Sequence, residues 1–247
     1  MPRSIKTEAV VLRSIRYGEA DRILHLYTPD HGRVGAIAKG VRKTKSRFGG
    51  RLEPFHRVGL VLHQGRSDLL TVTAVDTVTP HRQLHASAGA VDAASRACDA
   101  VSRLFEHADP QRAVFHLLCN ELQLLDDLAR NDVAQRLVLH ANQIAFRLKL
   151  LLAAGFTPML SSCATCGEGD RIAGFSGAAG GVVCASCEAG SFPLGEEAHA
   201  FMTTALGAPL ASSPQASERA LRQAERAVSE TVEHHAHTRL RMATATA

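Results

Sequence analysis

The first 80 residues alternate between short apolar stretches and glycines. Five segments are rich in Val, Ile, Leu and Thr, a composition that favours β-strands: residues 5–15, 22–28, 33–38, 55–62 and 69–78. Glycines interrupt or separate them: Gly18, Gly32, Gly40, Gly59 and Gly65. Five short strands in 80 residues predict a small β-barrel.

The interval between the third and fourth predicted strands is longer than a hairpin turn. It holds the sequence KGVRKTKSRFGGRLEP, with room for one short helix. A helix at this position matches the layout of an OB-fold. An SH3-like barrel is the alternative.

From Leu84 onward the apolar positions recur every three or four residues, which is typical of helices that pack in a bundle. Three such sets are Ala90, Ala94, Ala97 and Val101; then Val114, Leu117, Leu118, Leu125 and Leu128; then Val133, Leu137, Ile144, Leu148 and Leu151. Asp109-Pro110 and Asn131-Asp132 are cap and break signals between them, and Ser213-Pro214 is expected to start a further helix.

Four cysteines follow the pattern Cys163-x-x-Cys166, a seventeen-residue loop, then Cys184-x-x-Cys187. Two such pairs at this separation are typical of a four-thiolate zinc site, which leaves no coordination position open for water or substrate. Gly167 suits the turn after the first pair, whereas Glu188 stands at the same place after the second. We expect one structural zinc ion per chain. The alternatives are disulfides or four unrelated buried thiols.

These patterns predict an α+β multidomain protein with an N-terminal OB-fold β-barrel, followed by an α-helical domain that carries an inserted four-cysteine zinc finger. The expected ranges are 1–80 for the barrel, 81–157 for the first part of the helical domain, 158–193 for the zinc finger, and 194–247 for the C-terminal helical part and tail. Cys98 and Cys119 fall in helical apolar patterns and are expected to be buried core residues without a function.

Charge is divided unevenly between these regions. Residues 1–80 carry fourteen Lys and Arg against seven Asp and Glu, a net of +7, whereas the remainder carries fourteen against seventeen, a net of −3. The asymmetry predicts a polyanionic partner for the barrel. Nucleic acid is favoured over a membrane surface, because the barrel region contains no amphipathic, lipid-seeking helix.

Six cations occur within thirteen residues that contain no acid: Lys39, Arg42, Lys43, Lys45, Arg47 and Arg51. Small residues lie between them, so the segment is expected to contact phosphates, with a solvated turn as the alternative. Arg13, Arg16 and Arg33 are expected as neighbouring DNA contacts. Phe48 and Tyr17 are candidates to stack on bases, but aromatics are scarce here, so binding should be mainly electrostatic.

No pattern indicates an enzyme. Gly35 and Gly40 have the spacing of a phosphate-binding loop, but Val41 and Arg42 stand where that motif requires Lys and then Ser or Thr. Neither cysteine pair follows a proline, as it would in a zinc deaminase. Three histidines near the C-terminus are expected to be surface residues: His234, His235 and His237.

The first sixteen residues lack a signal-peptide core and no segment is apolar enough to span a membrane, so a cytoplasmic location is expected.

Three segments carry a resemblance to a known family. They are AVVLRSIRYGEADRILHLYTPDHGRVGAIAKGVRKTKSRFGGRLEPF, FRLKLLLAAGFTPMLSSCATCG and GGVVCASC. In these the chain resembles the bacterial RecO family of recombination mediators. The resemblance implies an OB-fold that binds single- and double-stranded DNA, and annealing of complementary strands without ATP. It also implies a nucleoid-associated role with RecR, which helps load RecA onto DNA coated by single-stranded-DNA-binding protein.

The same resemblance implies a site for the acidic, hydrophobic C-terminal tail of single-stranded-DNA-binding protein. Such a tail needs an apolar slot with cations at its rim. Because the barrel's cations are assigned to DNA, we expect Arg136, Arg147 and Lys149 to serve it, with solvated edges of a core helix as the alternative. Two competing functions are a zinc-stabilised protein–protein adaptor whose barrel contacts nucleic acid incidentally, and a zinc hydrolase or deaminase.

Overall fold

A computed structural model describes residues 4–65, 68–106, 109–131 and 136–242 of the chain. The chain divides into two compact units, Met1–Arg130 and Asn131–Ala247. The helical region is shared between them, because two helices pack on the barrel and the later ones form the second unit.

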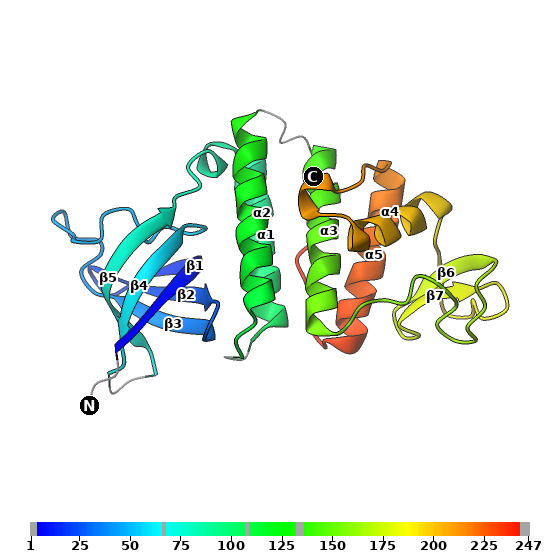
Figure 1. The fold of residues 1–247 in the computed structure, drawn as a ribbon, viewed down its shortest axis with the longest axis horizontal. Helices are drawn as coiled ribbons and strands as arrows, with labels where there is room; N and C mark the ends of the chain where they lie inside the picture. Colours follow the sequence, from blue (N-terminus) through cyan, green and yellow to red (C-terminus); the bar gives the residue numbers. More distant parts are fainter. Residues whose placement is uncertain (1–3, 66–67, 107–108, 132–135, 243–247) are drawn as a thin grey trace. The chain divides into compact units, whose positions relative to one another are not determined.

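Five strands make the barrel: β1 Ser4–Tyr17, β2 Asp21–Thr28, β3 Gly32–Ala38, β4 Arg57–His63 and β5 Leu70–Thr79. They close in the order β1-β2-β3-β5-β4, with β3 and β5 parallel and every other pair antiparallel (Figure 1). This is the arrangement of an OB-fold. The predicted barrel is confirmed, and each strand lies within two residues of its expected bounds.

Strand β1 is long because it pairs with two neighbours in succession. Ser4 to Val10 pair with β4, and Val10 to Tyr17 pair with β2. A bulge lies between Val11 and Arg13. The extra residue keeps Val11 in the barrel core and places Arg13 on the outer face, where simple alternation would have pointed it inward.

The short helix expected between β3 and β4 is absent, since residues 39–56, all described, form successive turns. Gly40 and Gly49 adopt left-handed backbone conformations, with φ of 68° and 54°, which interrupt a right-handed helix. Phe48 and Leu52 insert from this segment into the barrel core, each 1% exposed. Phe48 is therefore part of the barrel core, and the expectation that it stacks on bases is wrong.

Two helices complete the first unit: α1 Ala88–Leu104, preceded by a short 3₁₀ turn at Leu84–Ala86, and α2 Arg112–Arg130. The Phe105 ring meets Tyr27 of β2 edge-on at 6.4 Å between centroids. Arg57 of β4 lies over the Phe115 ring of α2 at 5.6 Å. Cys98 and Cys119 are buried in these helices, as expected, and burial raises the pKa of Cys119 to about 11.

The second unit contains α3 Arg136–Ala154, β6 Ile172–Ser176, β7 Gly181–Cys184, β8 Phe192–Pro193, α4 Glu196–Gly207 and α5 Glu218–His235. The strands form a small sheet in the order β7-β6-β8, inserted between α3 and α4. The helix expected from Ser213-Pro214 begins four residues later, because the Ser217 side chain caps α5 by accepting from the Ala220 N–H at 3.3 Å. Asp132 and Val133, used to predict α3, lie outside the described residues.

Helix α3 forms the centre of the second unit. The expectation that no segment is apolar enough to span a membrane is wrong for α3, which is long and apolar enough by length and composition. However, 67% of that stretch is buried inside the structure. It packs against both α4 and α5. These properties are those of the core helix of a globular unit.

Candidate DNA-binding surface and metal centre

The cation-rich segment 39–51 is attached at its start to the turn between β1 and β2. The N–H of Gly40 donates to Oδ1 of Asp21 at 2.7 Å, and the N–H of Arg42 donates to the Ala20 carbonyl at 2.8 Å. The Arg42 guanidinium lies 3.5 Å from the Gly18 carbonyl oxygen. Two regions separated in sequence, the hairpin turn and the cationic segment, are thereby held together. No sequence pattern singles out Asp21 for this role.

All six predicted cations of this segment are exposed: Lys39, Arg42, Lys43, Lys45, Arg47 and Arg51. Among the described residues, none of the six forms an ion pair with a carboxylate. Other barrel arginines are neutralised: Arg22 pairs with Glu53 at 3.1 Å, and Arg57 pairs with Glu8 at 2.6 Å. The structure thus places six cations without a carboxylate partner among the described residues on one short segment.

The arginines of this segment are held by backbone and ring contacts that leave their charge unneutralised. Nη1 of Arg51 donates to the Phe48 carbonyl at 3.3 Å and to the Arg47 carbonyl at 3.4 Å. The Arg47 guanidinium lies 4.8 Å from the centroid of the Phe48 ring. The buried ring therefore orients a cation that remains available to a phosphate.

The three arginines expected beside this segment differ in their surroundings. Arg13 and Arg16 are exposed on β1. Arg33 is half-buried on β3 and donates from Nη1 to the Ser102 carbonyl of α1 at 2.9 Å. Between Arg13 and Arg33 lies His25, whose pKa is lowered by burial and then by the charges of these two arginines. Arg33 thus acts partly as a structural contact to α1.

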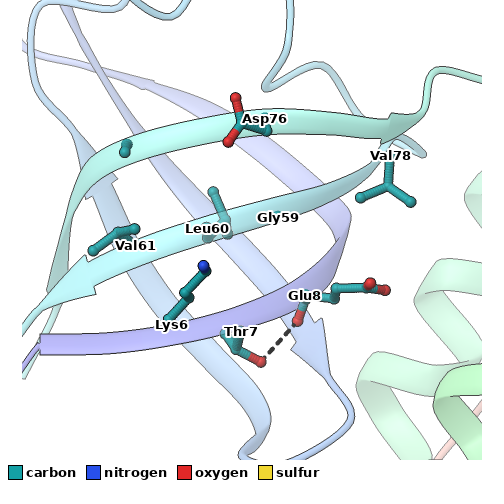
Figure 2. A pocket seen from close by; sticks show the side chains of 9 residues that line it. Lys6, Thr7, Glu8, Gly59, Leu60, Val61, Asp76 and Val78 are labelled. Atoms are coloured by element: carbon teal, nitrogen blue, oxygen red, sulfur yellow. Dashed lines mark hydrogen bonds between the residues drawn. The ribbon is translucent and has the colours of Figure 1, made fainter.

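A shallow hollow of ≈ 430 Å³ lies on another face of the barrel, across β1, β4 and β5 (Figure 2). Gly59 and Val61 line it, and Glu8, Asp76 and Lys6 stand around them. Its lining contains two carboxylates and one lysine. This face therefore lacks the excess of cations that a phosphate backbone requires.

The four predicted cysteines converge in the second unit. Their Sγ atoms all lie within 4.8 Å of one another, and those of Cys166 and Cys184 are 3.7 Å apart. A tetrahedral centre with metal–sulfur bonds of about 2.3 Å places its sulfurs about 3.8 Å apart. The cluster therefore fits one tetrahedral metal ion with no open position.

Backbone geometry prepares both pairs for this role. The N–H of Gly167 donates to the Cys163 carbonyl at 2.8 Å, and Gly167 has a φ of 81°, as the sequence leads us to expect. In the second pair, which extends from β7, the N–H of Cys187 donates to the Cys184 carbonyl at 2.9 Å. Glu188 does not need a positive φ here, so its presence does not disturb the second turn.

The ligands differ in exposure and in proton affinity. Cys163 and Cys184 are buried, at 2% and 4% exposure, whereas Cys166 is exposed. Hydrogen bonds from backbone N–H groups, that of Cys184 first, lower the pKa of Cys163 to about 6. Backbone N–H groups directed at the sulfur stabilise a thiolate, the form that binds metal.

The small sheet that carries Cys184 is fixed to α5. The His235 ring lies with Nε2 2.8 Å from the Gly177 carbonyl oxygen. A Cβ on Gly177 would come within 2.8 Å of the His234 ring, so only glycine permits this close approach. His235 is thus exposed but positioned against the finger. Among the described residues the histidines of α5 form no metal-binding cluster.

The three residues expected at a tail site do not form one surface. Arg147 is 2% exposed, and its guanidinium contacts the Glu225 carboxylate at 3.3 Å and the Arg241 carbonyl oxygen. Arg147 is part of the core, so the expectation that it is a cation at the rim of a tail-binding site is wrong. Lys149 donates to the carbonyls of Leu206 and Ala208. Arg136 is exposed, with a long 3.8 Å ion pair to Glu218.

Two family descriptions match nearly the whole chain. "Recombination protein O N terminal" matches residues 1–81, which include the barrel, and "Recombination protein O C terminal" matches residues 88–242, which include both helical parts and the cysteine cluster.

Similar proteins agree with this match. A DNA repair protein RecO of Rubrobacter xylanophilus is 37% identical over 233 residues, covering 90% of this chain and 89% of that protein. One from Anaeromyxobacter sp. is 34% identical over 244 residues, covering 96% and 93%. One from Bifidobacterium adolescentis is 42% identical over 192 residues, covering 72% of each. With its closed barrel, helical part and four-cysteine cluster, the chain belongs to the RecO family of DNA repair proteins.

Proposed function

We propose that this protein is a recombination mediator that binds single- and double-stranded DNA through its barrel and anneals complementary strands without ATP. The observation that carries the proposal is the segment 39–51, in which six exposed cations lie without a carboxylate partner among the described residues. A polyanion with closely spaced phosphates releases counterions when such cations bind it.

Annealing by such a surface requires no catalytic residue. Cations that neutralise two strands lower their mutual repulsion and raise their local concentration, and base pairing then supplies the free energy. The absence of the Lys-Ser/Thr pair after Gly40 agrees with a process that needs no nucleotide.

We further propose that the cysteine cluster holds one zinc ion per chain, in a structural role. Four thiolates at these separations match the ligand set that zinc prefers, and a tetrahedral site without an open position does not activate water. When bound, zinc would connect the two cysteine pairs and stabilise β6 and β7. Because a zinc ion with four thiolates carries a net negative charge and Glu168, Asp170 and Glu188 are exposed nearby, the finger is unsuited to phosphate contact.

The partners are proposed from what the resemblance to the family implies. We propose that the protein acts in the cytoplasm at the nucleoid, with RecR, to load RecA onto DNA coated by single-stranded-DNA-binding protein. The tail of the latter protein is assigned to the second unit, where Arg136 is the exposed candidate among the three predicted cations. A membrane is not among the proposed partners.

Strand annealing tests this function. Complementary oligonucleotides coated with cognate single-stranded-DNA-binding protein should anneal faster with the protein present and without ATP. A protein that leaves the annealing rate unchanged, with naked and with coated strands, would support the alternative of a protein–protein adaptor. A metal-dependent hydrolytic or deaminating turnover would instead support an enzyme.

A further inference from the structure

A strip of apolar side chains crosses the outer face of the barrel beside the cationic segment. Ile15 of β1 lies opposite Ile23 of β2, and Ile23 lies opposite Ile37 of β3. Residues directly opposite one another in a sheet place their side chains on the same face. Ile15 is 37% exposed, and Ile23 and Ile37 are half-buried. These three isoleucines, with Tyr17, are called the apolar strip.

The three isoleucines of the strip form one row, which lies between two other rows on the same face. On one side, Arg13 lies opposite His25, and His25 lies opposite Gly35. On the other side Tyr17, 54% exposed, lies opposite Asp21, and the exposed Lys39 directly follows the end of β3. Rows on one face of a strand are about 6.7 Å apart, so the three rows extend about 13 Å along the strands.

Along the strands, the face that carries the strip has the end of α1 on one side and the cationic segment on the other. Tyr27 and Arg33, in the row beyond His25, contact Phe105 and Ser102 at the end of α1. At the opposite end, the hairpin turn after Tyr17 is bonded to Gly40 and Arg42 of the cationic segment. A linear ligand that runs along the strands and crosses the strip therefore reaches the cations of that segment.

We infer that the apolar strip binds the bases of single-stranded DNA while Arg13 and the cations of segment 39–51 bind its phosphates. This inference rests on the proposed DNA binding and assigns the form of DNA to a particular surface. Tyr17 offers a ring on which a base can stack, and the isoleucines offer apolar contact to further bases. In a duplex the faces of the bases are stacked on one another, so they are not available to the strip, and the phosphates remain for the cations to bind.

The chemistry of the strip suits a protein that anneals strands. Isoleucine side chains neither donate nor accept hydrogen bonds, so they leave the pairing edges of the bases free. A base held by apolar contact and one ring can transfer to a complementary strand without first losing hydrogen bonds to the protein. Sequence preference should accordingly be weak, because every base offers a π-face.

Binding of the full-length protein to three labelled ligands of equal length tests the inference: a single strand, a single strand without bases, and a duplex. Tyr17→Ala should weaken binding of the ordinary single strand by about fivefold or more, and change duplex binding less than about twofold. The base-free strand should bind Tyr17→Ala and the wild type equally. Tyr17→Phe should retain binding, and Ile15→Ser should resemble Tyr17→Ala.

Val78→Ser provides a matched control, since Val78 is 46% exposed and lies beside the hollow of Figure 2. It should change binding of none of the three ligands. Equal losses for single strand and duplex in Tyr17→Ala, or no loss for either, would overturn the role of the strip and leave DNA binding itself intact. A wild-type protein that bound neither ordinary ligand at low salt would overturn the proposed function instead.

Discussion

The N–H of Gly40 donates to the carboxylate of Asp21 at 2.7 Å, and this bond joins the first turn of the cationic segment to the hairpin that ends β1. An acid in the middle of a surface assigned to DNA opposes phosphate binding by charge. Its hydrogen bond favours binding, because it fixes the position of the cations that follow. The charge of Asp21 lowers DNA affinity and its hydrogen bond raises it, so the affinity of a variant at this position shows which effect is larger.

Asp21→Ala should weaken single-stranded DNA binding by about fivefold, the equivalent of about 1 kcal/mol for one lost hydrogen bond. Glu19→Gln is the matched control, because it removes an exposed acid from the same turn without removing this bond. Glu19→Gln should leave affinity unchanged or raise it slightly. Fluorescence anisotropy at fixed salt measures both. Tighter binding by Asp21→Ala would show that the carboxylate acts only through its charge.

Stability of the first unit should fall as the solution becomes acidic. His81 is 3% exposed, with Nδ1 2.8 Å from the Phe55 carbonyl oxygen, and burial lowers the pKa of both His81 and His56. A histidine whose folded pKa is depressed stabilises the fold above its unfolded pKa of about 6.5, and this stability is lost as pH falls from there toward the folded value.

Thermal unfolding between about pH 7.5 and 5.5 checks this expectation, and His81→Asn should reduce the pH dependence of Tm. His116→Gln is the control, since His116 is exposed on α2 and should leave the pH dependence as in the wild type. An identical loss of Tm on acidification in the wild type and in His81→Asn would exclude His81 as the titrating group.

Removal of one ligand should abolish metal binding and disorder the finger without unfolding the barrel. Cys184→Ser takes a buried ligand from the end of β7, whereas unit Met1–Arg130 contains no part of the site. Elemental analysis should find one zinc per wild-type chain and none in the variant. Hydrogen exchange should show lost protection in β6 and β7, with β1 to β5 unchanged.

Two outcomes would contradict that expectation. Freshly purified wild-type protein without zinc would exclude the assignment of the metal. Loss of protection in the barrel together with the finger would show that the two units do not fold independently. Cys98→Ser, a buried cysteine outside the cluster, controls for the general effect of replacing a thiol.

The sequence predicts the barrel and the metal cluster well because both depend on local spacing. Strand alternation and the spacing of two cysteine pairs can be recognised in the sequence without knowledge of distant neighbours. The apolar strip cannot be predicted from the sequence, because Ile15, Ile23 and Ile37 become neighbours only through strand register and a bulge after Val11.

The errors have the same origin. Phe48 stands among cations in the sequence, but burial of its ring in the barrel outweighs its polar surroundings. Arg147 appears as an edge cation of an apolar helix, and only the folded unit reveals its partner Glu225, 78 positions away on α5. Long-range pairing of this kind cannot be derived from periodicity along one segment.

The central claim is that the cations of segment 39–51 bind DNA phosphates. Its most direct test is the salt dependence of single-stranded DNA binding by the variant Lys43→Glu, Lys45→Glu, Arg47→Glu. Each lost phosphate contact should remove about 0.7 from the slope of log K against log salt, so the slope should become shallower by about 2. The double variant Lys6→Glu, Arg82→Glu changes exposed charges elsewhere and should keep the wild-type slope. A folded triple variant with wild-type affinity and slope would contradict the assignment of this segment to DNA.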